Sequence, residues 1–182
     1  TPTSGAKHFI VFATGGGGGA GGGTPTGGAG GGGTAIRAYN STQMGSSASI
    51  TIGNGGNGGS ANSSQWNLNN GSHGGNTIFN PGGSGATITG GGGRRSTGTS
   101  GGSGGSGSNG QANLTGMSGA SLSTYSTRSA GGSSHFQDRG SGGLGATGSI
   151  TYVYDDTNDP PDYSATAGGS GTPGIVIVYE YG

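Results

Sequence analysis

The chain has 182 residues, of which 52 are glycine, whereas only 25% are hydrophobic and 7% are charged. This length suits one domain, but so low an apolar content excludes an ordinary domain built around a large hydrophobic core. The formal net charge is zero, so the chain lacks the excess positive charge that binding to nucleic acids or anionic membranes requires.

Such a glycine content is compatible with a disordered low-complexity chain or with an ordered chain whose glycine tracts pack through their backbones. Disorder commonly accompanies high net charge or repetitive bias. Here the net charge is zero, and the segments between the glycine tracts are neither charged nor repetitive. We therefore predict a single ordered glycine-rich domain over residues 1–182. Disulfide bonds do not contribute, because there is no cysteine.

The chain opens with a predicted strand at residues 7–14, KHFIVFAT, which is β-branched and aromatic and stops where a glycine run begins. Glycine-rich tracts then alternate with glycine-poor inserts over residues 15–173. Short strands are predicted within this region at 49–52, 76–80 and 149–154. The terminal segment 174–181, GIVIVYEY, is the strongest strand prediction in the chain.

The spacing of side chains within the tracts predicts their conformation. Residues 98–110, GTSGGSGGSGSNG, carry a side chain at every third position: Ser100, Ser103, Ser106 and Asn109. Residues 53–60, GNGGNGGS, repeat this spacing. We interpret 81–87 in the same way, with Pro81, Ser84 and Thr87 aligned, although residues 86–89 could equally form a strand. A period of three fits neither an α-helix nor a strand, but it fits the left-handed polyproline-II-type helix.

The predicted fold is therefore mostly irregular and β: a bundle, or sandwich, of polyglycine-II-type helices with short terminal strands and essentially no α-helix. Buried backbone groups need hydrogen-bonding partners, so such rods should bond to one another through their main chains. The chain has to reverse direction at each insert, so the inserts should collect at the two ends of the bundle. Loops on a rigid scaffold are where binding residues usually lie.

Several motifs resemble a known family of viral proteins. They are a strand entering a glycine run, FIVFATGGGGGAGGG, then SITIGNGGNGG, TITGGGG and the closing GGSGTPGIVIVYEYG. This pattern resembles the glycine-rich C-terminal domains of phage tail fibres and the distal tail-fibre adhesins of T-even-like phages. The resemblance implies a polyglycine-II sandwich at the distal end of a virion tail fibre. It implies that variable inserts bind a bacterial surface protein or glycan, with other tail-fibre subunits as further partners.

Receptor contacts are expected among the aromatic and arginine residues of the inserts, because such side chains bury much area with few rotatable bonds. The candidates are Arg37, Tyr39, Trp66, Tyr125, Arg128, His135, Phe136 and Tyr163. Each has an alternative role in sealing the ends of the glycine rods, since the chain has so few hydrophobic residues. The aromatic residues of the predicted strands are expected to be structural.

No catalytic, metal or cofactor site is predicted, so we expect a binding protein and not an enzyme. His8, His73 and His135 are scattered and have no cysteine or paired-histidine spacing. The acidic segment 155–162 lacks the spacing of a calcium loop, and no Ser, His and Asp set supports nucleophilic catalysis. The longest apolar run, 175–179, is too short to cross a bilayer, so no membrane insertion is expected.

Two other functions stay open at this point. One is a structural subunit of an extracellular filament, because unpaired strand edges are templates for the addition of further strands. The other is an ice-binding protein of the glycine-rich type. That function needs a flat face of small residues, which the long aromatic-bearing inserts would interrupt.

Overall fold

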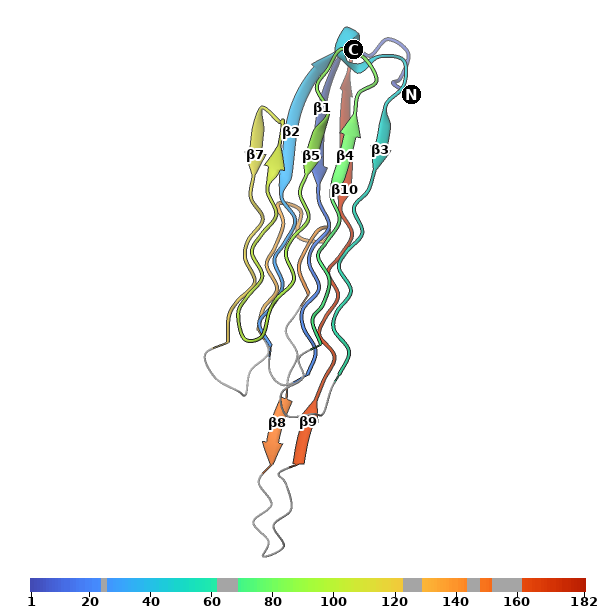
Figure 1. Cartoon of the computed structure of the whole chain (residues 1–182). Helices are drawn as coiled ribbons and strands as arrows, with labels where there is room; N and C mark the ends of the chain where they lie inside the picture. The colour runs from blue at the N-terminus through green and yellow to red at the C-terminus, as the bar shows by residue number, and fades with distance from the viewer. Residues whose placement is uncertain (24–25, 62–68, 123–128, 144–147, 152–161) are drawn as a thin grey trace, which may run out of the picture.

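The computed structural model describes residues 1–23, 26–61, 69–122, 129–143, 148–151 and 162–182 (Figure 1). The molecule is elongated, and its segments run up and down the long axis. The N- and C-termini lie together at one end, which we call the terminal end. We call the opposite end the far end.

Antiparallel sheets account for the strands of the described residues. The first sheet has the order β10 (Ile175–Tyr181), β1 (His8–Thr14), β2 (Thr34–Asn40) and β7 (Ala112–Leu114). The second has the order β3 (Ser49–Thr51), β4 (Thr77–Asn80), β5 (Ile88–Gly90) and β6 (Gly107–Ser108). Both lie toward the terminal end, whereas a two-stranded sheet of β8 (Gly148–Thr151) and β9 (Asp162–Ala165) lies at the far end (Figure 1).

Among the described residues the only α-helix is α1 (Ser41–Met44), a single turn of four residues between β2 and β3. Asn40 and Gln43 form a capping box: the Gln43 N–H donates to Asn40 Oδ1 at 2.9 Å, and the Asn40 N–H donates to Gln43 Oε1 at 3.0 Å. The prediction of an essentially non-helical fold is thus confirmed for the described residues. None of them belongs to a helix long and apolar enough to cross a membrane.

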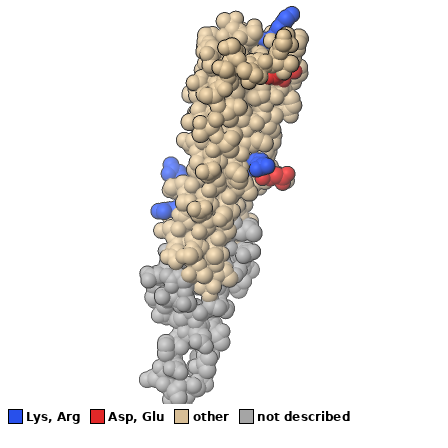
Figure 2. All heavy atoms as spheres, turned by 90° about the vertical axis from the view of Figure 1, so that its right-hand side faces the viewer, with Lys and Arg blue, Asp and Glu red and all other residues tan. Residues whose placement is uncertain are grey.

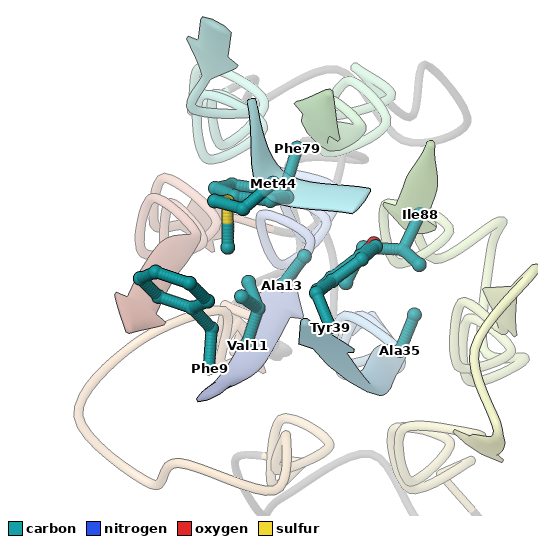
Figure 3. Close-up of a cluster of buried hydrophobic side chains, with 8 residues drawn as sticks. All are labelled: Phe9, Val11, Ala13, Ala35, Tyr39, Met44, Phe79 and Ile88. Atoms are coloured by element: carbon teal, nitrogen blue, oxygen red, sulfur yellow. The ribbon is translucent and has the colours of Figure 1, made fainter. Parts of the chain in front are cut away.

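A small hydrophobic core lies between the two large sheets (Figure 3). Successive side chains of a strand alternate between its faces, so β1 turns every second residue inward. The buried cluster consists of Phe9, Val11, Ala13, Ala35, Tyr39, Met44, Phe79 and Ile88. It draws on β1 and β2 of one sheet, β4 and β5 of the other, and α1, which closes the core at the terminal end.

The glycine-rich segment 15–23 continues directly from β1 and lies inside the bundle. Successive N–H groups from Gly15 to Ala20 donate in rotation to residues 30–33, 72–75 and 169–172, at 2.9–3.0 Å, so every third N–H returns to the same neighbour. The carbonyls of residues 16–18 accept from three further segments, through the N–H groups of Gly93, Gly56 and Gly143 at 2.8 Å. Segment 15–23 is therefore bonded on all sides.

Segment 26–33, which leads into β2, has the same environment. Its N–H groups from Gly28 to Gly33 donate in rotation to residues 117–120, 140–143 and 91–94, at 2.7–3.0 Å. Every described residue from 13 to 35 is buried. The two glycine segments are thus the interior of the molecule below the sheets, and backbone contacts replace an apolar core there.

The outer glycine tracts are buried with a period of three. Gly53, Gly56 and Gly59 are buried, whereas Asn54, Asn57 and Ser60 are exposed. Likewise Gly102 and Gly105 are buried, and the serines of that tract, Ser100, Ser103 and Ser106, are exposed. The side chains that recur at every third position of these tracts are thus exposed, and the glycines between them include the buried positions.

Two predicted tracts differ from the structure. Residues 81–87 form a turn against α1, where Gly82 has a φ of 76° and the Gly85 N–H donates to the Gln43 carbonyl at 3.1 Å. The tract at 98–110 is regular only in its middle, because the chain reverses at Thr97–Ser100 and again at Asn109, whose φ is 58°. Spacing alone missed these turns, since glycine serves turns as well as rods.

Candidate functional site

The described residues next to several undescribed ranges meet at the far end. The Gly22 N–H donates to the Asn69 carbonyl at 2.8 Å, and the Gly23 N–H donates to the Thr166 carbonyl at 3.1 Å. Positions 23, 69 and 166 thus come together, although they are far apart in the sequence. Thr166 directly follows β9, which Figure 1 shows at the end opposite the termini.

A second set of flanking residues lies beside the first. The Leu122 N–H donates to the Thr99 carbonyl at 2.9 Å, and the Ala120 N–H donates to the Ala130 carbonyl at 2.9 Å. The Gly28 N–H in turn donates to the Ala120 carbonyl at 3.0 Å, which fixes this set to the interior segment. Both ends of the 121–129 insert are therefore held at the far end.

Of the eight predicted contact residues, the structure places Tyr163 at this end. Trp66, Tyr125 and Arg128 lie outside the described residues, in the stretches whose flanks have just been placed. Tyr163 lies on β9, which pairs with β8; its side chain is outside what the structure describes. One flanking side chain is held by a neighbouring tract: Asn69 Nδ2 donates to Ser60 Oγ at 2.9 Å.

Arg37 lies on β2, toward the terminal end. Its Nη1 donates to the Asn109 carbonyl at 3.0 Å, and its guanidinium carbon lies 5.7 Å from the centre of the Tyr39 ring. Its Nε is buried and has no hydrogen-bond partner among the described residues. Arg37 thus links β2 to the turn after β6 through a hydrogen bond.

Tyr39 is a core residue, with only 2% of its surface exposed. Its hydroxyl donates to the Ala86 carbonyl at 2.8 Å, and burial raises its pKa to about 12. The sequence placed it among candidate surface contacts, but the structure gives it the sealing role that was the alternative. The reason is that β2 pairs with β1, which puts Tyr39 opposite Phe9 on the inner face.

We expect the Tyr39→Phe variant to be about 1–2 kcal/mol less stable at neutral pH, because the Ala86 carbonyl loses its donor. The raised pKa means that the folded state resists ionisation of Tyr39, so this residue makes wild-type stability fall as the pH rises above about 10, its value in the unfolded chain. The difference in free energy of unfolding between wild type and variant should therefore largely disappear by pH 12. Urea denaturation between pH 7 and pH 12 measures it; a constant gap would contradict the assignment.

His135 and Phe136 lie on the outer side of the first sheet. The Phe136 ring packs edge-on against Phe12 of β1 with 5.8 Å between ring centres, and Phe12 packs edge-on against Tyr179 of β10 at 5.9 Å. His135 is exposed and stacks edge-on against Phe136 at 5.0 Å. This insert therefore reverses beside the sheet and not at a tip of the bundle, and Phe136 covers part of the outer face of β1.

Charged side chains are sparse on the described surface (Figure 2). Among the described residues no group of three or more histidine, cysteine or acidic side chains is placed to hold a metal ion. Four of the six acidic residues fall in the segment 155–162, whose side chains lie outside the described residues.

A lateral groove of about 510 Å³ was not predicted from the sequence. It lies on the side of the bundle and is lined by His73, Asn76, Arg94, Ser103, Ser106 and glycine backbone. His73 and Arg94 are distant in the sequence and meet only because their tracts are neighbours. The sequence feature that could have indicated this groove is the size of the His73 and Arg94 side chains, because the outer tracts around them consist otherwise of glycine and short polar residues.

The far end thus holds the flanks of several inserts on a narrow, backbone-bonded support, and the lateral groove adds a polar hollow on the side. Neither place brings a nucleophile, a general base and an oxyanion-binding group together among the described residues. The sequence matches no protein-family model, and no curated protein is significantly similar to it.

Proposed function

We propose that the chain is the tip adhesin of a phage tail fibre, which attaches the virion to a bacterial surface receptor, an outer-membrane protein or a glycan. The single observation that carries this proposal is the convergence of insert flanks at the far end, where Gly22 is hydrogen-bonded to Asn69 and Gly23 to Thr166. An adhesin has to present its variable segments at one exposed end. The end with the two packed sheets then faces the rest of the fibre.

We further propose that the glycine tracts are polyglycine-II helices. The rotation of N–H donors among three neighbours, with every third residue returning to the same one, supports this conformation. A left-handed helix of three residues per turn has that symmetry, whereas a strand directs its hydrogen bonds to two sides only. Glycine lets the rods approach closely enough to bond through their main chains.

In this proposal the scaffold contributes rigidity. Ordering a loop on binding costs conformational free energy, and a pre-organised support reduces that cost. Segments 15–23 and 26–33 are bonded to neighbours on all sides, so the positions from which the inserts leave are fixed before contact. Recognition then depends on the insert side chains and involves no chemical step.

Exchange of inserts tests the proposal. Residues 61–70 and 121–129 are replaced by the corresponding inserts of an adhesin from a phage with another host range, and adsorption to both hosts is measured. We expect adsorption to follow the inserts, and an exchange of the glycine tract 101–106 to leave the host unchanged. Adsorption that follows the glycine tract instead would refute the proposal.

A filament subunit remains the second candidate because of one feature. β10 is an edge strand of seven residues in the first sheet, and Tyr179 and Tyr181 on it are 50% and 49% exposed. Such an edge can pair with another chain. Light scattering separates the two functions: an adhesin keeps one mass as its concentration rises, whereas a filament subunit elongates.

A further inference from the structure

We propose that the lateral groove binds an acidic oligosaccharide, with a phosphate or carboxylate of the sugar held between Arg94 and His73. This site is separate from the inserts at the far end. The inference rests on the shape of the groove, the hydrogen bonds already made by its side chains, and its unpaired positive charge.

The shape follows from three adjacent outer tracts. The Gly74 N–H donates to the Gly93 carbonyl at 3.0 Å, and the Arg94 N–H donates to the Ser103 carbonyl at 2.9 Å, so the tract carrying Arg94 lies between the other two. Gly91 and Gly92 on this middle tract have no side chains to fill the space, whereas the flanking tracts carry Asn76 and Ser106. The result is a hollow along the bundle.

The groove presents hydrogen-bond donors. His73 Nδ1 accepts the backbone N–H of Arg95 at 3.2 Å, so the neutral ring carries its proton on Nε2. Asn76 Oδ1 accepts the Gly92 N–H at 2.9 Å, which leaves the Asn76 amide nitrogen as a donor. The Arg94 guanidinium adds further donors. A group bound here has to accept hydrogen bonds, as phosphate and carboxylate oxygens do.

The charge agrees with this requirement. Among the described residues neither Arg94 nor Arg95 makes an ion pair, so no carboxylate of the described surface neutralises them. Burial, together with the positive charges of Arg94 and Arg95, lowers the pKa of His73. The same positive potential that disfavours an imidazolium favours an anion beside it.

An oligosaccharide fits the groove better than other anionic partners. Its lining is hydroxyl, amide, imidazole, guanidinium and backbone, with no apolar side chain to receive a peptide anchor or an acyl chain. Nucleic acids need a larger positive surface than two arginines provide, and the chain has no net charge. A sugar chain with one acidic group needs hydroxyl partners along the groove and one cationic site.

The test uses the whole purified chain and four probes: a tetrasaccharide carrying one phosphate, one of equal length carrying one uronate, the neutral tetrasaccharide, and inorganic phosphate. Binding is followed by titration calorimetry and by the NMR amide shifts of residues 73 and 94. Both acidic tetrasaccharides should bind with similar shifts, and the neutral one should not bind. The Arg94→Gln/Arg95→Gln double variant should lose at least about tenfold in affinity, as expected for charged hydrogen bonds.

The matched control is Arg139→Gln, which removes an exposed arginine outside the groove and should change the affinity less than about twofold. Equal losses in the control and in the double variant would overturn the site, as would equal binding of the neutral tetrasaccharide. Inorganic phosphate that binds as tightly as the phosphorylated tetrasaccharide would overturn the assignment to a sugar. Because no insert is changed, failure here is distinguishable from failure of the adhesin proposal.

Discussion

Replacing Gly19 with alanine is expected to cost about 4 kcal/mol or more, a large share of the total stability of about 5–15 kcal/mol that is typical of a domain. A Cβ at this position would stand 2.0 Å from the Asn57 carbonyl oxygen and 2.4 Å from its carbon. Both atoms belong to the backbone, so no side chain can rotate away. Relief requires that the tract 53–60 move away from this segment, which breaks the hydrogen bonds from the Gly56 N–H to the Gly17 carbonyl and from the Gly59 N–H to the Ala20 carbonyl.

Gly21→Ala in the same segment is the matched control. The nearest atom to a Cβ there is Thr26 Cγ2 at 3.4 Å, an ordinary contact. Alanine also restricts the unfolded chain, which favours folding by about 0.4–1 kcal/mol. We expect the free energy of unfolding to stay within about 1 kcal/mol of wild type. Urea denaturation measures the free energy of unfolding of both variants. Equal losses of stability would mean that the close approach of backbones at Gly19 is not the cause of its destabilisation.

The positions of the glycine tracts could be predicted from the spacing of their side chains. Which tracts lie side by side in the bundle could not. Segment 15–23 donates to partners that include residues 169–172, at the other end of the chain. Contacts between glycine backbones involve no side chain, so the sequence contains no pattern that distinguishes one partner tract from another. The groove formed by His73 and Arg94 depends on the same choice of neighbours and was hidden for the same reason.

The strands were predictable where side chains alternate. Four predicted strands match β1, β3, β4 and β10 to within a residue at either end. β2 was missed, because an arginine and alanines on it obscure the pattern of a half-buried strand. Pairing with β1 on one side and β7 on the other imposes the extended conformation, and this pairing also turns Tyr39 inward. The candidates Trp66, Tyr125 and Arg128 lie outside the described residues and stay predictions.

Phe79→Ala is expected to cost about 3–5 kcal/mol. Phe79 is 1% exposed and lies on β4, where its ring is 5.9 Å from that of Tyr39 across the two sheets (Figure 3). The cavity would open in the one apolar cluster that the described residues form. Ile78→Ala on the same strand is the control: Ile78 is 37% exposed, so its loss should cost about 1 kcal/mol or less.

The Phe79→Ala variant also tests whether the sheets and the glycine bundle unfold together. β1 and β2 run into segments 15–23 and 26–33 without a linker, and Thr14 and Thr34 at these junctions share a buried hydrogen bond of 2.7 Å. A weakened core should therefore lower the protection of glycine amides as well as strand amides. Hydrogen exchange of Phe79→Ala measures both. Glycine amides that stay protected while β4 opens would show two separate cooperative units, with the bundle stable on backbone hydrogen bonds alone.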